Sequence, residues 1–277
     1  MTRRRLDQVL VERGLAPSRQ AAQALIMSGR VQVEGRTLEK PGTQVDPLVG
    51  VSVAGPALPY VGRGGVKLAG ALDAFGLDVT GLAALDVGSS TGGFTDCLLQ
   101  RGAARVVCVD VGHGQLDWKL RNDPRVTVLE GINARYLSPA ELPEGWRPEL
   151  AVIDVSFISL KLVLPRIAPL VGFEADRAPA GARGSIVALV KPQFEVGRGN
   201  VGRGGIVRGR SLRAGALTGI ASFALSMGLS VRAMIRSPIS GAEGNIEYFV
   251  LLDSRTGGFK AEEIDENALT LTQEEPE

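Results

Sequence analysis

The sequence contains very few of the side chains that enzymes use to bind metals or to form disulfides. His113 is the only histidine among 277 residues, and Cys97 and Cys108 are the only cysteines. One imidazole excludes a multi-histidine metal site and restricts any histidine-dependent triad to that position. Two cysteines exclude a disulfide framework or a four-thiolate cluster, and both lie in apolar segments, where we expect them to be buried. We therefore expect no metal site.

The sequence also lacks a secretory signal and a long apolar run. After the basic residues 3–5, Leu6 is followed at once by Asp7 and Gln8, so we expect no cleaved leader. The longest uncharged stretch, residues 214–231, is interrupted by Gly, Ser and Thr, which favours a helix followed by a strand over a membrane span. We expect a cytoplasmic protein with reduced cysteines and no membrane segment.

Net charge is nearly absent, because 31 Lys and Arg offset 30 Asp and Glu to leave +1. The regions differ, however. Residues 1–60 have 8 basic and 5 acidic side chains, residues 61–250 have 21 and 17, and residues 251–277 have 2 and 8. An acidic tail, residues 254–277, therefore offsets the positive charge of the rest of the chain. The net charge of +1 does not exclude a nucleic-acid partner. We expect this tail to be disordered.

Residues 1–59 have the pattern of a small α+β module. Apolar residues at helical spacing predict two short helices, and residues 29–36 alternate like a short strand that ends in a glycine turn. Five arginines could meet phosphates on one face: Arg3, Arg4, Arg5, Arg19 and Arg30. On charge alone, scattered solvated arginines are the competing explanation.

Three segments of this module, residues 5–10, 18–22 and 25–35, resemble the αL-type RNA-binding module that is named after a small-subunit ribosomal protein. The match has few gaps. It implies structured RNA as the partner, held mainly through phosphates and shape.

After a linker at residues 60–66, residues 67–253 alternate short apolar runs with helical patterns. Candidate strands are 82–87, 106–111, 126–129, 150–155, 186–191, 229–235 and 246–252, and the main helical patterns are 94–101, 115–122, 160–171 and 212–227. This alternation predicts an α/β fold with a Rossmann-like, seven-stranded, mostly parallel sheet. Ligands of such sheets bind at the carboxyl ends of the strands.

A glycine-rich loop, residues 86–96, follows the first of these strands and leads into a helix. A phosphate-binding loop would need a lysine after Gly93, and a dinucleotide loop would need glycine at Ser90. S-adenosylmethionine has a sulfonium and no phosphate, so the acidic strand end at Asp86 suits it. Asp110 ends the next strand, where a carboxylate can accept hydrogen bonds from an adenosine ribose. The pattern favours an adenosine cofactor, and ordinary α/β architecture is the alternative.

Four charged residues stand at strand or helix ends around this loop: Lys67, Asp154, Lys191 and Glu247. An ionisable residue directly after an apolar strand is expensive to bury without a function. Solvated salt bridges at the rim of the sheet are the alternative explanation.

Four segments, residues 60–68, 86–96, 154–160 and 191–195, resemble the TlyA family, whose methyltransferase domain is of the FtsJ-like ribose 2′-O-methyltransferase type. The resemblance runs from Arg5 to Leu252. It implies methylation of cytidine ribose in ribosomal RNA of both subunits, with S-adenosylmethionine as cofactor and with the four charged residues as a catalytic tetrad. The expected cofactor-binding residues are Asp86, Gly88, Ser89, Ser90, Thr91, Gly92, Gly93, Asp110, Val111 and Asn133. Gly131 departs from the family, which often has a larger polar residue there.

Because His113 is the only histidine, we expect a lysine to accept the proton in the reaction. We predict that Lys191 accepts the proton of the ribose 2′-hydroxyl, with a pKa lowered by burial and by the charge of Lys67. Asp154 and Glu247 would oppose that shift and orient the two lysines.

Residues 197–213 contain five arginines and no acid. We expect RNA phosphates to be held by Arg198, Arg203 and Arg208 of this loop and by Arg63. Phe157 is the best candidate for packing on a flipped base, because aromatic residues are few. A flexible surface loop and a core phenylalanine are the alternatives.

Three other functions are weighed against this one. A base methyltransferase for exocyclic amines would carry Asn/Asp-Pro-Pro-aromatic, where residues 154–157 read Asp-Val-Ser-Phe. An RNA-binding assembly factor without turnover would not need the intact tetrad. A membrane-active haemolysin, the activity for which the family is also named, does not match a composition without pore-like segments.

Overall fold

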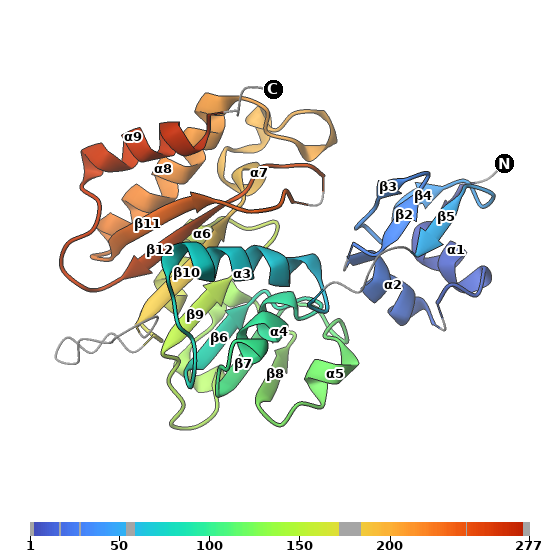
Figure 1. The fold of residues 1–277 in the computed structure, drawn as a ribbon, viewed down its shortest axis with the longest axis horizontal. Coiled ribbons are helices and arrows are strands. Elements are labelled where there is room, and N and C mark those ends of the chain that lie inside the picture. Colours follow the sequence, from blue (N-terminus) through green and yellow to red (C-terminus); the bar gives the residue numbers. More distant parts are fainter. Residues whose placement is uncertain are drawn as a thin grey trace.

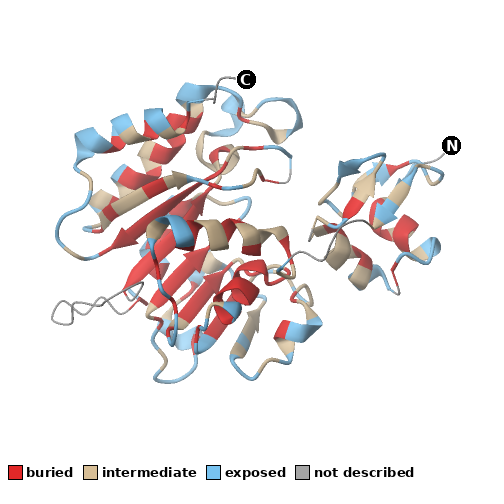
Figure 2. Cartoon of the chain, viewed as in Figure 1, coloured by how far each residue is buried: buried red, intermediate tan, exposed pale blue. Residues whose placement is uncertain are grey.

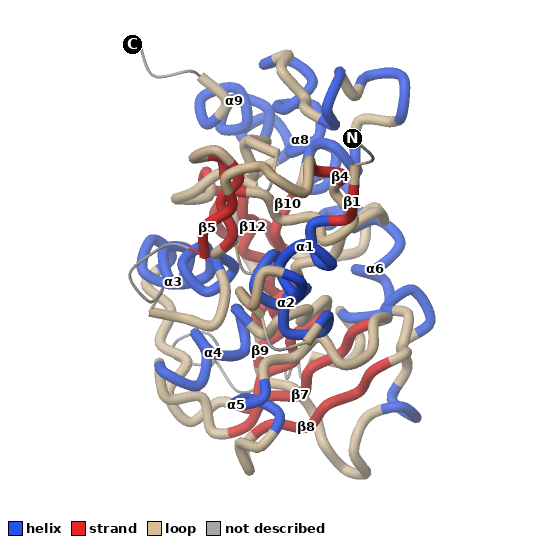
Figure 3. Tube along the Cα trace, turned by 90° about the vertical axis from the view of Figure 1, so that its right-hand side faces the viewer, coloured by secondary structure: helices blue, strands red, loops and turns tan. Residues whose placement is uncertain are grey.

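The chain forms a small N-terminal module and a larger α/β domain beside it (Figure 1). The computed structural model describes residues 3–16, 18–27, 29–53, 59–171, 184–241 and 243–273. The view rotated by 90° shows the N-terminal module in front of strands of the large sheet (Figure 3).

The N-terminal module has two helices packed on short strands, as predicted. Its elements are β1 (Arg4–Arg5), α1 (Leu6–Glu12), α2 (Arg19–Met27), β2 (Val31–Val33), β3 (Arg36–Thr37), β4 (Gln44–Val45) and β5 (Val51–Val53). A core of Leu6, Leu10 and Ile26 is fully buried. Glu34 and Gly35 both have positive φ, which is the turn geometry that joins two-residue hairpins such as β2–β3.

The large domain is built on one seven-stranded sheet in the order β11-β12-β10-β9-β6-β7-β8. The strands are β6 (Ala83–Val87), β7 (Arg105–Asp110), β8 (Val126–Glu130), β9 (Leu150–Ile153), β10 (Ser185–Val190), β11 (Ser230–Arg236) and β12 (Tyr248–Asp253). Only β12 runs antiparallel to its neighbours. The prediction of a mostly parallel Rossmann-like sheet is confirmed, and all seven strands lie within about two residues of their predicted places.

Helices cover both faces of the sheet, whose strands are the most buried part of the molecule (Figure 2). One face packs against α6 (Leu160–Ile167), α8 (Arg210–Ser226) and α9 (Ala261–Leu271), and the other against α3 (Arg63–Phe75) and α4 (Gly93–Gln100). The remaining turns are α5 (Trp118–Arg121), α7 (Pro192–Glu195), η1 (Ala134–Tyr136), η2 (Pro139–Glu141), η3 (Arg198–Asn200) and η4 (Arg203–Gly205).

Two predicted elements differ in the structure. The helix expected over residues 115–122 is only α5, because the backbone N–H of Asp117 bonds to Thr91 and its side chain caps the helix at Lys119. The tail was expected to be disordered, yet it contains α9, with Ile264 and Ala268 fully buried. The acidic average of the tail concealed this apolar stripe, so the prediction of disorder is wrong for residues 261–271.

The sheet order reverses between β6 and β9, so the loops after these two strands diverge and leave a crevice at their carboxyl ends. Among the described residues, we find no helix whose length and hydrophobicity suit a transmembrane span.

Candidate active site

The glycine-rich loop after β6 packs against the end of β9. Gly88 has φ of +86°, and a Cβ there would lie 2.4 Å from the carbonyl oxygen of Asp154. The backbone N–H of Gly88 donates to Val109, which ties the loop to β7 as well. Only glycine fits this position, and the close approach leaves the loop backbone open toward the crevice.

Asp110 anchors the other side of the loop. Its carboxylate accepts the backbone N–H of Ser90 at 2.8 Å and that of Gly112 at 2.7 Å. Val111 follows with an exposed side chain, 67 % accessible, which is suited to contact a planar base. Asn133 begins η1 by accepting the N–H of Arg135.

Gly131 explains the position of the single histidine. A Cβ at Gly131 would lie 2.8 Å from Cε1 of His113, so the imidazole packs where a larger side chain would stand. The space beside Gly131 is therefore occupied by His113, which the sequence left without a role.

Asp86 is fully buried beneath the loop. Thr95 donates to its Oδ2 at 2.6 Å, whereas Oδ1 has no hydrogen-bond partner among the described residues. Burial raises the pKa of Asp86 to about 7 against the opposing bond from Thr95, and the charge of Asp154 adds to the rise. A carboxylate with an orphaned oxygen and a glycine cradle that contains no lysine fit a cationic, phosphate-free cofactor.

The four predicted catalytic residues come together as two ion pairs in one cleft. Lys67, on α3, lies 2.7 Å from Oε2 of Glu247, and Lys191, at the end of β10, lies 2.7 Å from Oδ1 of Asp154. Lys191 also donates to the hydroxyl of Ser156 at 2.9 Å. The cleft has a volume of about 370 Å³ and is also lined by Gly88, so the ion pairs face the cofactor loop.

The pKa of Lys191 differs from the prediction. Burial does lower it, as the largest single effect, but the charges of Asp154, Glu247 and Glu39 and the hydrogen bond with Asp154 all act against burial, and the pKa of Lys191 is raised overall. The prediction of a lowered pKa is therefore wrong for this state of the protein, because the sequence could not give the distance to Asp154.

Several predicted RNA-binding arginines are engaged within the protein. Arg5 and Arg19 both pair with the buried Asp7, which also accepts a bond from Gln23. Other ion pairs join Arg4 to Glu12 and Arg63 to Glu39. Exposed side chains are found at Arg3, Arg30, Arg198, Arg203 and Arg208.

Phe157 lies beside the catalytic cleft in an unusual conformation. It has φ of +65°, its side chain is 83 % exposed, and its ring lies 5.1 Å from that of Phe194. Backbone strain of this kind in a non-glycine residue concentrates at functional sites. Phe194 was missed in the sequence, because nothing local indicates that α7 turns it toward Phe157.

Two further sets of residues were also missed. Asn245 is buried and holds the arginine-rich loop through its bonds to Gly205 and Val207. The N-terminal module contributes Glu39 and Lys40 to the cleft, where Lys40 pairs with Glu243. These contacts join segments far apart in the chain, so no local sequence pattern indicates them.

The family model for FtsJ-like methyltransferases matches residues 60–254. The chain belongs to the FtsJ-like methyltransferase family. A second model, the S4 domain, matches residues 4–48 and corresponds to the N-terminal module. The FtsJ-like domain identifies the chain as an S-adenosylmethionine-dependent methyltransferase, which favours an enzyme over an assembly factor without turnover, and the S4 domain indicates an RNA substrate.

Known proteins resemble the chain over almost its full length. The 16S/23S rRNA (cytidine-2′-O)-methyltransferase TlyA of Mycobacterium tuberculosis is 48% identical over 255 residues, 92% of this chain and 91% of that protein. Hemolysin A of Brachyspira hyodysenteriae is 40% identical over 88% of this chain and 97% of its own. A solved structure of a hemolysin candidate from Streptococcus thermophilus is 40% identical, with a TM-score of 0.69 over 98% of this chain and 97% of its own. The resemblance to the TlyA family is confirmed.

Proposed function

We propose that this protein transfers a methyl group from S-adenosylmethionine to the ribose 2′-oxygen of cytidine in ribosomal RNA. The observation that carries the proposal is the pairing of Lys191 with Asp154 and of Lys67 with Glu247 in one cleft beside the cofactor loop. The name of the M. tuberculosis relative supports both the ribosomal substrate and the 2′-oxygen. Whole ribosomal subunits and deproteinised RNA are the two substrates to compare.

The cofactor would be held by residues of the loop and its neighbours. The open backbone from Gly88 to Gly93 would receive it, the carboxylate of Asp110 would accept hydrogen bonds from the ribose hydroxyls, and Val111 and Asn133 would lie beside the adenine. When bound, S-adenosylmethionine supplies a methyl group on a positively charged sulfur. The buried carboxylate of Asp86 favours positive charge at this edge of the sheet.

Lys191 is the residue that meets the substrate hydroxyl. A ribose hydroxyl is a weak acid, so it needs a base as it attacks, and the neutral Nζ of Lys191 accepts that proton. The raised pKa of Lys191 keeps it protonated at rest. Positive charge added nearby lowers the pKa of Lys191, which is the direction that base catalysis requires.

The remaining charged residues position the reacting groups. Asp154 fixes the direction of the Lys191 ammonium, and Glu247 does the same for Lys67. A fixed pair of lysines can hold the ribose in line for transfer, and alignment of this kind accounts for several kcal/mol of catalysis in general. Phe157 and Phe194 offer an aromatic platform for the flipped cytosine.

Methyl transfer to ribosomal RNA tests the proposal directly. Tritiated S-adenosylmethionine should label ribosomal RNA, with the label mapped to a cytidine 2′-oxygen. Lys191→Ala should lose about 10²- to 10⁴-fold in rate, the range general for a missing acid–base group. Lys161→Ala, an exposed lysine on α6, is the matched control and should keep full activity. Normal transfer by Lys191→Ala, or a label on a base, would overturn the proposal.

A further inference from the structure

A second cavity lies between the two domains and has no part in the chemistry described above. Its volume is about 900 Å³, and it separates helix α2 of the S4 domain from α5 of the methyltransferase domain. The α2 side is lined by Ala21, Ala24 and Leu25, and the opposite side by Trp118. Aliphatic residues on one wall and an aromatic residue on the other leave a slot with apolar walls.

Trp118 is held in place and yet uncovered. It is the first residue of α5, whose start is capped by Asp117 through a 2.9 Å bond from the N–H of Lys119, and its carbonyl accepts a bond from Asn122. The side chain is nevertheless 76 % exposed. An exposed indole on a backbone held in this way can stack with a planar partner, because only its two side-chain torsions need to be ordered.

The rim of the cavity carries positive charge. Arg30, Lys119 and Arg121 line it, against the carboxylates of Asp96 and Asp117. Lys119 remains 70% exposed, with its Nζ 3.6 Å from Asp96. Arg121 is held by its ion pair with Glu130, so Lys119 and Arg30 are the cations that can turn toward a phosphate in the cavity.

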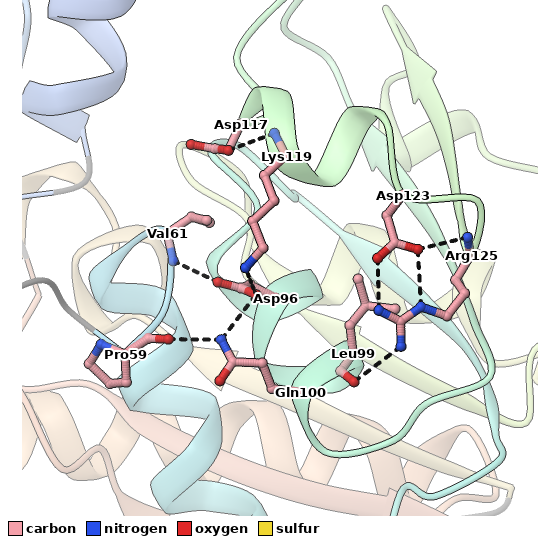
Figure 4. Close-up of polar contacts among 9 residues, drawn as sticks. All are labelled: Pro59, Val61, Asp96, Leu99, Gln100, Asp117, Lys119, Asp123 and Arg125. Carbon is pink, nitrogen blue, oxygen red and sulfur yellow. Dashed lines mark hydrogen bonds and ion pairs between the residues drawn. The ribbon is translucent and has the colours of Figure 1, made fainter.

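The floor of the cavity is the end of the interdomain linker, which is pinned to α4 (Figure 4). The N–H of Val61 donates to Asp96 at 2.9 Å, and the side chain of Gln100 donates both to Asp96 and to the carbonyl of Pro59. Figure 4 shows these groups converging on Asp96, with Lys119 reaching it from α5. The slot thus has a fixed floor between its two walls.

The cavity adjoins the catalytic cleft at one shared residue. Thr91, in the cofactor loop, lines both of them, and its carbonyl accepts the N–H of Asp117 just before Trp118. A strand that enters the cleft can therefore pass along the slot toward the S4 domain, where Gln20 of α2 bonds to Gly114.

We propose that this cavity binds an unpaired nucleotide of the RNA substrate, with its base stacked on Trp118 and its phosphate beside Arg30. The inference rests on the proposed function, because it assigns the same substrate a second contact outside the catalytic cleft. Stacking on an aromatic side chain tolerates any base, so this contact selects unpaired RNA rather than a sequence.

Fluorescence tests the contact directly, since the chain has two tryptophans, Trp118 and Trp146. In the full chain with Trp146→Phe, Trp118 is the only tryptophan. A ten-nucleotide single-stranded oligocytidine should quench its emission, and an RNA duplex of equal length should not. If the single strand does not change the emission of Trp118, the proposal is wrong.

Kinetics give the second measurement. Trp118→Ala should raise the KM for ribosomal RNA by about 5- to 100-fold, the range typical for loss of one stacked base, with kcat and S-adenosylmethionine affinity unchanged. Trp118→Phe should recover most of the loss, and Leu269→Ala, an exposed apolar residue on α9, should behave as wild type. An unchanged KM in Trp118→Ala would refute the site. A wild-type label on a base rather than on ribose would instead refute the proposed function, so the two failures are distinct.

Discussion

Asp7 changes the roles of two arginines that the sequence assigns to RNA. It is completely buried, and although burial favours its neutral form, the bonds from Arg5, Gln23 and Arg19 hold its pKa well below the ordinary value. Arg5 and Arg19 therefore form ion pairs that stabilise the S4 domain, although the side chain of Arg19 stays 53% exposed. Arg3 and Arg30, which are also exposed, are predicted RNA contacts of this domain that Asp7 does not engage.

The pairing of Lys191 with Asp154 leads to a prediction about pH. Because the carboxylate raises the pKa of Lys191, Asp154→Asn should lower that pKa, so the neutral amine forms at lower pH. The rising limb of kcat against pH should move to lower pH by about 1 unit or more, even though kcat itself falls from poorer alignment. Ser156→Ala removes a neutral partner of Lys191 and should leave the limb in place. A limb that stays fixed in Asp154→Asn would show that Lys191 is not the titrating group.

Strands were the elements that the sequence predicted best, because buried parallel strands are short, continuous apolar runs such as residues 150–153. The cofactor loop, Asp154 and Lys191 could be found for the same reason, since they directly follow such runs. Lys67, on α3, and Glu247, before β12, follow no such run, so their assignment to the tetrad depended on the resemblance to the family. Helices were harder to predict from the sequence. The apolar positions of α9 are few within an acidic segment, and α5 is shortened by a bond from Asp117 to the distant Thr91. Contacts between domains, such as that of Lys40 with Glu243, leave no local trace.

The turn from β6 into α4 supports a second prediction. Gly88→Ala places a methyl group against the backbone of Asp154 in a conformation that L side chains rarely adopt, so it should cost about 1–3 kcal/mol in unfolding free energy. It should also weaken S-adenosylmethionine binding by about tenfold or more, as measured by calorimetry. Gly215→Ala, inside α8 and without close neighbours, is the matched control and should stabilise the protein by about 0.4–1 kcal/mol. Equal effects of the two substitutions would contradict the role of the loop.

For the whole molecule, the uneven charge matters more than its sum. A net charge of +1 alone would give RNA binding that hardly responds to salt. If the exposed arginines of both domains contact phosphates, the slope of log affinity against log salt should be about −4 or steeper, because each neutralised phosphate contributes just under one unit. Filter binding at several salt concentrations measures the slope, and S-adenosylmethionine affinity serves as the salt-insensitive control. A slope near zero would show that these arginines do not contact RNA phosphates.

Glu39 belongs to the S4 domain, yet it lines the catalytic cleft, where it pairs with Arg63 of the methyltransferase domain, and its negative charge contributes to the raised pKa of Lys191. Thermodynamic coupling is reciprocal, so the docked position of the S4 domain and the protonation of Lys191 influence each other. If RNA binding shifts that domain, Glu39 should move relative to Lys191 and the pKa of Lys191 should change with it. An RNA that seats the S4 domain differently would therefore meet a catalytic base with a different pKa.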